Sequence, residues 1–178
     1  MTELPKPTMF TMQEIERNGY GALLIHFNAG ALDIPLVDKT REELRDFMAG
    51  EAPMPLREPS DFCPCMLVDM AEITGMSEPG LGCLIRLLKR GLSWDPPYVV
   101  ALINVVPSVM SLLRLTRMAE VFPIYENADS AMADICQHPS PKSKEEYSEL
   151  LQKLKPTNLG SAWRGNRENK PTSGTTQG

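Results

Sequence analysis

The sequence predicts an α/β protein with a mainly parallel sheet and packed helices. Short apolar runs of strand length alternate with amphipathic stretches of helix length, in the order strand, strand, helix, strand, helix, strand, helix, strand, helix. Repeated strand–helix units of this size imply parallel strands that are joined by helices. With 178 residues, 42% of them hydrophobic, the chain is long enough for one domain with a core.

The first part of the chain is predicted to contain strands and one helix. Residues 1–19, with two prolines near their start, are expected to form an N-terminal leader. The segment GALLIHFNAGALDI at 21–34 begins as an apolar run and then meets turn-forming residues, which predicts two short strands or a hairpin. A helix is predicted over LVDKTREELRDFMAG at 36–50, where Thr40 and Glu43 have the spacing of a capping box.

The middle of the chain is predicted to hold a long loop, a strand and a helix. Residues 51–64 contain four prolines without a regular period, which is typical of a loop. The segment CMLVDMAEITG at 65–75 indicates a buried strand that ends near Asp69 or Met70. In the helix that follows, apolar side chains recur at helical spacing and predict one buried stripe. They are Leu81, Leu84, Ile85 and Leu88.

The last part of the domain is predicted to be strand, helix, strand and helix. YVVALINVV at 98–106 indicates a fully apolar strand, and Pro107 suits the first position of the next helix. VFPIY at 121–125 predicts a short final strand, and ENADSAMADICQ at 126–137 predicts a helix. That helix has two candidate caps, Asn127 and Asp129.

Beyond the globular domain, which is expected to span residues 20–137, a further helix is predicted at 142–156. Its apolar line could dock on the core or wait for a partner. Residues 157–178 are rich in Gly, Asn, Ser, Thr and Lys, which cannot bury enough apolar surface to offset the entropy of ordering. We expect this tail to be disordered.

The composition excludes several classes of function. The net charge is −5 and Lys and Arg form no run, which argues against a nucleic-acid surface. No apolar stretch approaches the roughly 20 residues that span a bilayer, so we expect a cytoplasmic protein without direct membrane insertion. The four cysteines fit neither a disulfide framework nor a zinc pattern, so no metal or cofactor is expected.

The sequence contains no recognisable catalytic motif. Gly80-Leu81-Gly82 lacks both the Lys of a phosphate-binding loop and the third glycine of a dinucleotide-binding turn. Only His26 and His138 could activate a nucleophile. His26 lies in an apolar strand, where a hydrogen-bonded structural histidine is typical, and His138 lies in a Pro-rich stretch. We therefore expect a protein that is not an enzyme.

The segment GMSEPGLG at 75–82 stands between the central strand and an amphipathic helix. Pro79 suits a first helical position, and Ser77 or Glu78 can cap the helix. The small glycines would let the helix pack closely on the sheet. On these residues alone, the segment is a capped helix start.

Three segments together resemble a known family. GALD at 30–33, LVDMAEITGMSEPGLGCLIRLLKR at 67–90 and VVALINVVPSVMSLLRLTRMAEVFPIYENADSAM at 99–132 resemble, in order and spacing, the STAS domain of bacterial anti-sigma factor antagonists. The resemblance covers residues 20–136. It implies a STAS-like fold, with a small, mixed but mainly parallel sheet of four to five strands and helices packed mostly on one side.

The resemblance also implies a function in partner switching. In this family the unphosphorylated domain binds an anti-sigma factor with a serine-kinase fold and so frees a sigma factor. Phosphorylation of the first serine in an Asp-Ser-Ser segment at the helix start breaks that complex. The expected partner of this chain is therefore an anti-sigma factor or another serine-kinase-fold protein, and the oligomeric state stays open.

This chain departs from the family at that segment. Ser77 stands where the family has Asp, Glu78 where it has the phosphorylated serine, and Pro79 at the second serine. Either Glu78 holds a fixed charge that imitates the phosphorylated state, or the domain binds a different partner without a switch. Ser77 could accept the phosphate instead if the register is shifted, although a helix-cap serine is its ordinary use.

We expect the contact surface to comprise the turn at 77–81 and the loop before it. The residues of this candidate site are Asp33, Ser77, Glu78, Pro79, Gly80 and Leu81. Two alternatives remain at this point. The chain could be a constitutive STAS subunit or scaffold of a larger complex, such as a lipid-transport ATPase or a stress-sensing assembly, or it could bind a small ligand.

Overall fold

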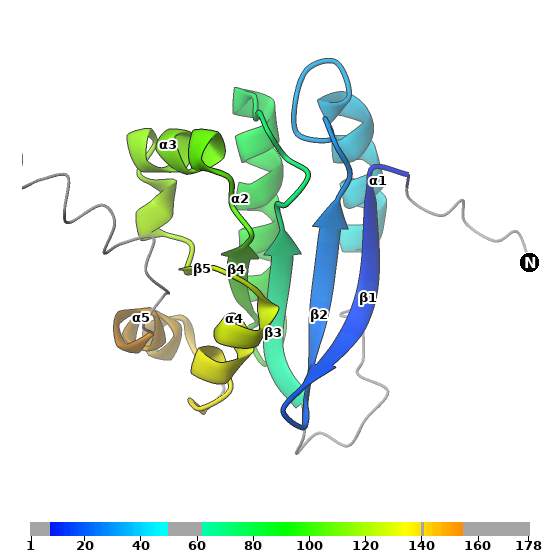
Figure 1. The fold of residues 1–178 in the computed structure, drawn as a ribbon. Coiled ribbons are helices and arrows are strands. Elements are labelled where there is room, and N and C mark those ends of the chain that lie inside the picture. Colours follow the sequence, from blue (N-terminus) through cyan, green and yellow to red (C-terminus); the bar gives the residue numbers. More distant parts are fainter. Residues whose placement is uncertain (1–7, 50–61, 140, 155–178) are drawn as a thin grey trace, which may run out of the picture.

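The sheet of this protein is mixed but mainly parallel. The computed structural model describes residues 8–49, 62–139 and 141–154. Its five strands lie in the order β1-β2-β3-β4-β5 (Figure 1). β1 is antiparallel to β2, and the other neighbouring pairs are parallel. The strand bounds are Phe10–Arg17, Tyr20–Phe27, Phe62–Asp69, Val99–Ile103 and Ile124–Tyr125. The predicted α/β class with a small, mainly parallel sheet is confirmed.

Helices cover both faces of the sheet, but unequally. The helices are α1 (Val37–Ala49), α2 (Glu78–Ser93), α3 (Pro107–Leu115), the short 3₁₀ helix η2 (Met118–Glu120), α4 (Ala128–Ile135) and α5 (Lys144–Lys153). In Figure 1, α1 and α2 lie side by side behind the sheet, and α4 lies in front of it, against β3, β4 and β5. α3 lies beyond the carboxyl end of β4. Two adjacent helices thus form one layer, and α4 forms a partial second layer.

Apolar packing between these layers forms the core. Phe10 of β1 makes edge contacts with Phe27 of β2 and Phe47 of α1, both with ring centroids 6.1 Å apart. On α2, a Cβ added at Gly91 would collide with the side chain of Val100, so the helix backbone lies directly on β4. All of β4 is buried, as expected for a parallel strand between two helix layers.

The expected leader over residues 1–19 is wrong for residues 10–17, which form β1. Only Phe10 and Ile15 of this strand are buried, so it lacks the apolar run that marks a central strand. The signal that was missed is Asn18-Gly19. Both residues have a positive φ, 54° and 84°, and they form the two-residue turn that joins β1 to β2.

Two other expected boundaries also differ. The segment at 21–34 contains nearly all of β2, up to Phe27, followed by a series of turns rather than a second strand, and Gly30 in these turns has a left-handed backbone (φ 75°). The loop predicted at 51–64 ends earlier, since β3 begins at Phe62. Residues 50–61 and 155–178, which hold the rest of that loop and the predicted tail, lie outside the described residues.

Thr40 and Glu43 do not form a capping box, because α1 begins three residues before Thr40. The buried hydroxyl of Thr40 donates instead to the carbonyl oxygens of Ala31 (2.5 Å) and Leu36 (3.3 Å). The Glu43 carboxylate accepts bonds of 2.8–2.9 Å from the amides of Thr8 and Met9 and from the Thr8 hydroxyl. Glu43 therefore ties the start of β1 to α1.

The other helices follow the sequence prediction with small shifts. In α2, Leu84 and Leu88 are buried as predicted, whereas Leu81 and Ile85 are only half-buried. Compared with the predicted stripe, the buried face of α2 is rotated towards Cys83 and the small residues of the helix, which approach the sheet most closely. α4 is capped by Asn127, one of the two predicted caps. α5 docks on the core through its apolar line of Tyr147, Leu150 and Leu154.

Replacing Glu43 by Gln should destabilise the protein at neutral pH. Burial opposes the charge of Glu43, but bonds from Met9 and Thr8 and the charge of Lys39 outweigh it and hold the pKa of Glu43 below its ordinary value. Hydrogen bonds to a charged group are worth about 1 kcal/mol more than neutral ones. We therefore expect E43Q to lower the free energy of unfolding by about 1 kcal/mol, measured by urea denaturation.

The deficit of E43Q should shrink as the pH falls through the pKa of Glu43 in the folded protein, because the wild-type carboxylate is then neutral as well. E42Q is the matched control. Glu42 is exposed and its carboxylate lies 3.8 Å from Arg45 on the same helix, so its loss should cost no more than about 0.5 kcal/mol. Equal effects of the two variants would contradict the role of Glu43.

Candidate functional site

The predicted site lies at the carboxyl edge of the parallel strands. This edge gathers the ends of β2, β3 and β4, the loop between β2 and α1, and the starts of α2 and α3 (Figure 1). Ligands and partners of open α/β sheets commonly bind at this edge, because the loops that leave the strands there are free to vary. Two groups of residues stand out, a tight contact around Ser77 and a polar network around His26.

Ser77 is the N-cap of α2, which confirms its interpretation as a helix cap. Its hydroxyl accepts a bond from the amide of Gly80 (3.2 Å) and donates one to the carbonyl of Leu32 (3.0 Å). The Ser77 amide donates to the same carbonyl, also at 3.0 Å. The hydroxyl thus holds the loop before α1 against the start of α2. A phosphoryl group on this oxygen would remove its bond to Leu32.

Gly80 makes this contact sterically possible. A Cβ at Gly80 would overlap the carbonyl group of Leu32, which is backbone and cannot turn aside. Gly82, two residues further along α2, has no atom within 4 Å of the corresponding position. The two glycines therefore have different roles: Gly80 is required by the approach of two backbones, and Gly82 is not.

The remaining predicted site residues lie around this contact. Asp33 follows Leu32 directly, and its carboxylate accepts a bond from the amide of Ile34 (2.9 Å). Glu78 begins α2 and is exposed, Pro79 stands in its first turn, and Leu81 is half-buried against the core. The structure thus brings Asp33 next to the turn at 77–81, although Asp33 and Ser77 are 44 positions apart in the chain.

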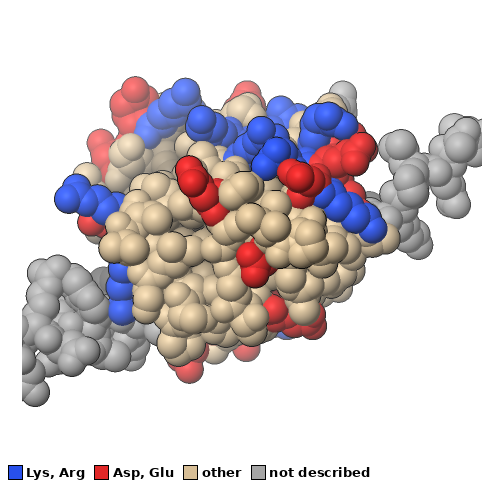
Figure 2. All heavy atoms as spheres, turned by 90° about the horizontal axis from the view of Figure 1, so that it is seen from above, with Lys and Arg blue, Asp and Glu red and all other residues tan. Residues whose placement is uncertain are grey.

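The sequence prediction missed two exposed apolar residues in the same loop. Ile34 is 69% exposed and Leu36 is 38% exposed. They flank Pro35 just before α1. The sequence signal that could have indicated them is an apolar residue on each side of a proline that follows a turn. Viewed from above this edge (Figure 2), Lys and Arg gather along one side, and the middle is largely uncharged with separate acidic side chains.

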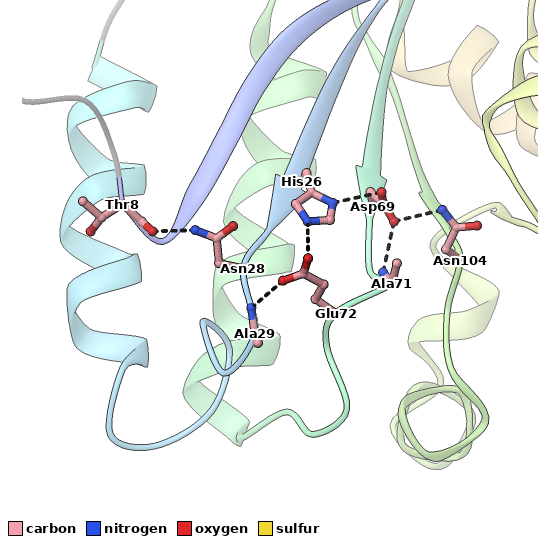
Figure 3. A network of polar contacts seen from close by, with 8 residues as sticks. All are labelled: Thr8, His26, Asn28, Ala29, Asp69, Ala71, Glu72 and Asn104. Carbon is pink, nitrogen blue, oxygen red and sulfur yellow. Dashed lines mark hydrogen bonds and ion pairs between the residues drawn. The ribbon is translucent and has the colours of Figure 1, made fainter.

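His26 lies between two carboxylates (Figure 3). Its Nδ1 is 2.9 Å from Oδ2 of Asp69, and its Nε2 is 3.4 Å from Oε1 of Glu72. The second oxygen of Glu72 accepts a bond from the amide of Ala29 (3.2 Å). His26 and Asp69 meet because their strands are paired in register at these positions.

Asp69 is held in place from three directions. Besides the His26 ring, its carboxylate accepts bonds from the side-chain amide of Asn104 (2.9 Å) and from the backbone amide of Ala71 (3.0 Å). Asn104 follows β4 directly and has a left-handed backbone (φ 54°), a conformation that Asn tolerates better than most residues. The ends of β2, β3 and β4 are thereby linked by side chains.

These contacts shift the pKa values of both partners. The hydrogen bond to Asp69 is the largest influence on His26 and raises the pKa of its ring, and burial opposes it while Glu72 adds to it. Burial is the largest influence on Asp69 and acts to raise its pKa. The bonds from Asn104, His26 and Ala71 together outweigh burial, so the pKa of Asp69 is lowered.

This arrangement does not suit nucleophilic catalysis. Both ring nitrogens of His26 face carboxylates, which leaves no nitrogen directed at a serine or cysteine. His138 lies 3.9 Å from Asp134, away from this edge. Among residues 8–49, 62–139 and 141–154, no group of His, Cys, Asp and Glu side chains could hold a metal ion. None of the helices in these ranges is long and apolar enough to cross a membrane.

Comparison with solved structures gives a distant likeness. No protein-family model matches the chain, and no curated protein is significantly similar to it. Among solved structures, it is similar to the crystal structure of an anti-sigma factor antagonist from Mycobacterium paratuberculosis. The two share 13% sequence identity, the match covers 76% of this chain and 99% of that chain, and the TM-score is 0.48. A likeness at this level does not indicate which partner this chain binds.

Replacing Gly80 by Ala should destabilise the protein, whereas replacing Gly82 by Ala should not. The methyl group of G80A would force α2 away from the Leu32 carbonyl, and overpacking of this kind costs about 1–3 kcal/mol. The methyl group of G82A meets no neighbour, and Ala favours a helix over Gly by about 1 kcal/mol. Thermal and urea unfolding of the two variants would measure the difference, and equal stabilities would contradict the close contact.

Proposed function

We propose that this chain is a non-enzymatic regulator that binds another protein in the cytoplasm, in the manner of an anti-sigma factor antagonist. The observation that carries the proposal is the exposed apolar pair Ile34 and Leu36, which lies beside the start of α2. The sequence resemblance assigns partner contacts to this turn. Exposed apolar side chains that adjoin such a turn are typical of protein interfaces.

The charge at the start of α2 supports a role in partner choice. Ser77 caps the helix, so the side chain of Glu78 is not needed for that purpose. Glu78 is exposed, and no ion-pair partner is assigned to it within the described parts of the chain. A phosphoserine would carry about −1.5 to −2 charges at neutral pH, and Glu78 carries about −1. If Glu78 imitates a phosphoserine, it does so with a weaker charge and fewer acceptor oxygens, so it weakens the complex with the partner rather than abolishing it.

This proposal specifies the chemistry of the partner surface. Asp33, Asp38 and Glu78 are exposed acidic residues on the loop, on the first turn of α1 and at the start of α2. The partner should offer an apolar depression for Ile34 and Leu36. It should have basic residues opposite Asp33 and Asp38 and none opposite Glu78, whose charge opposes the complex. An anti-sigma factor with a serine-kinase fold is the expected partner, because the family that the sequence resembles binds such proteins.

The test is a comparison of wild-type protein with E78S and E78A in affinity capture from the host's lysate, followed by mass spectrometry. If Glu78 acts as a fixed phosphate mimic, a serine-kinase-fold protein should be retained more strongly by both variants. That protein should also phosphorylate E78S when the two are mixed with ATP. If all three proteins retain the same kinase-fold partner equally, Glu78 does not act as a switch.

A second pair of variants tests the surface itself. I34D places a charge in the proposed apolar contact and should weaken binding of the captured partner by about tenfold or more, as measured by calorimetry. L115D is the matched control, because Leu115 is 83% exposed at the end of α3 and lies outside the proposed surface. Retention of full affinity by I34D, or an equal loss with L115D, would contradict the proposed surface.

A further inference from the structure

The side chain of Glu72 joins the two loops that form the proposed surface. One of its oxygens lies 3.4 Å from Nε2 of His26, at the end of β2. The other accepts a bond from the amide of Ala29, in the loop between β2 and α1. Glu72 itself belongs to the segment that leads from β3 to the start of α2. We call His26, Asp69, Glu72 and the Ala29 amide the clasp (Figure 3).

The clasp is complete only when His26 carries two protons. A neutral imidazole has a single N–H and can donate to one carboxylate, while its other nitrogen presents a lone pair. In this structure both nitrogens face carboxylate oxygens, so a neutral ring would set a lone pair against one of them. The Asp69 contact is shorter and its carboxylate more buried than that of Glu72, so Glu72 is the partner that would separate.

No other charge on the neighbouring elements replaces this proton. On β1 the residue paired with His26 is Thr11, which carries no charge. On the β4 side Asn104 binds Asp69 and is also neutral. Asp69 and Glu72 are the charged groups that act on the His26 ring among the described residues. The protonation of His26 therefore decides whether Glu72 is attracted or repelled.

We propose that the clasp is a proton-dependent latch that fixes the loop at 28–36 against the segment at 70–77, and so regulates partner binding at that surface. The second half of this proposal, the regulation of partner binding, rests on the function proposed above, whereas the latch itself does not. With His26 protonated, Glu72 stays on both His26 and Ala29, and the surface is pre-ordered. When His26 loses its proton, Glu72 is released, and the partner must itself order the part of the loop near Ala29 and the segment that carries Glu72, which weakens binding.

The direction of the pH effect follows from the raised pKa of His26. A histidine has an ordinary pKa near 6.5. Because the folded protein holds the proton more tightly than the unfolded chain, the latch and its contribution to stability are fully present below that value. Both are lost as the pH rises through the higher pKa of His26 in the folded state. Partner affinity should fall over the same interval.

The latch can be tested without a partner, by NMR titration of the full chain between about pH 5 and pH 9. The amide signal of Ala29 should shift with the same midpoint as the ring signals of His26. In E72Q the pKa of His26 should fall, and the shift of Ala29 should disappear. Hydrogen exchange at Ala29 should become several-fold faster in E72Q at low pH, because the neutral amide oxygen of Gln accepts more weakly than a carboxylate.

E149Q serves as the control, because it removes an equal charge from the exposed face of α5. It should leave the titrations of His26 and Ala29 unchanged. E72Q is expected to fold, since the Glu72 side chain is 53% exposed. An Ala29 signal that does not follow His26, or an unchanged pKa of His26 in E72Q, would overturn the latch whatever the partner is.

Coupling to binding is tested separately, with the serine-kinase-fold partner that the capture experiment identifies. Wild-type affinity should fall several-fold between about pH 6 and pH 8.5. E72Q should show, at both pH values, the weaker affinity that the wild type has at the higher pH. If the Ala29 titration holds and affinity does not change with pH, the regulatory half of the proposal is overturned. If no such partner exists, the proposed function fails, and the NMR titration still decides the latch.

Discussion

The carboxyl edge of this protein depends on one backbone group, the carbonyl of Leu32. It accepts bonds from both the amide and the hydroxyl of Ser77, and it lies where a side chain at residue 80 would otherwise be. Through this group the loop that follows β2 is attached to the start of α2. The positions of Asp33 and of the exposed residues Ile34 and Leu36 follow from it, because they come directly after Leu32 in the chain.

A second set of bonds supports the same loop from the other side. The Thr40 hydroxyl of α1 donates to the carbonyl of Ala31, and Glu72 accepts from the amide of Ala29. The loop is thus held by backbone groups at residues 29, 31 and 32, while the side chains that follow Leu32 stay accessible. A surface whose backbone is fixed in the free protein loses little entropy when a partner binds, which favours affinity and specificity.

Much of the fold could be predicted from local signals in the sequence. Pro107 marked the start of α3, the apolar run before Asp69 marked β3, and helical spacing marked α2. β1 was missed because an edge strand with a single covered face needs few apolar residues, and Phe10 and Ile15 are the ones it buries. Its hairpin turn, at residues 18 and 19, carried more information than its composition.

The candidate site was predictable only in part, for a related reason. The turn at 77–81 is continuous in the sequence, so its cap could be recognised from Ser77 and Pro79 alone. The pairing of His26 with Asp69 joins residues 43 apart, and it depends on the register of two parallel strands, which no local pattern specifies. The contact of Gly80 with Leu32 is of the same kind. In both cases the residue types were visible, but their neighbours were not.

The way in which Glu43 anchors the start of β1 has a practical consequence for the design of fusion proteins. Thr8 and Met9 are bonded to α1, and they also lie beside Asn28, at the beginning of the loop that carries the proposed surface. An affinity tag or fluorescent protein joined at Thr8 would therefore emerge next to that surface and could block it. In Figure 1, α5 lies towards the opposite end of the sheet. A label placed after α5 would leave the surface accessible to immobilised or diffusing partners.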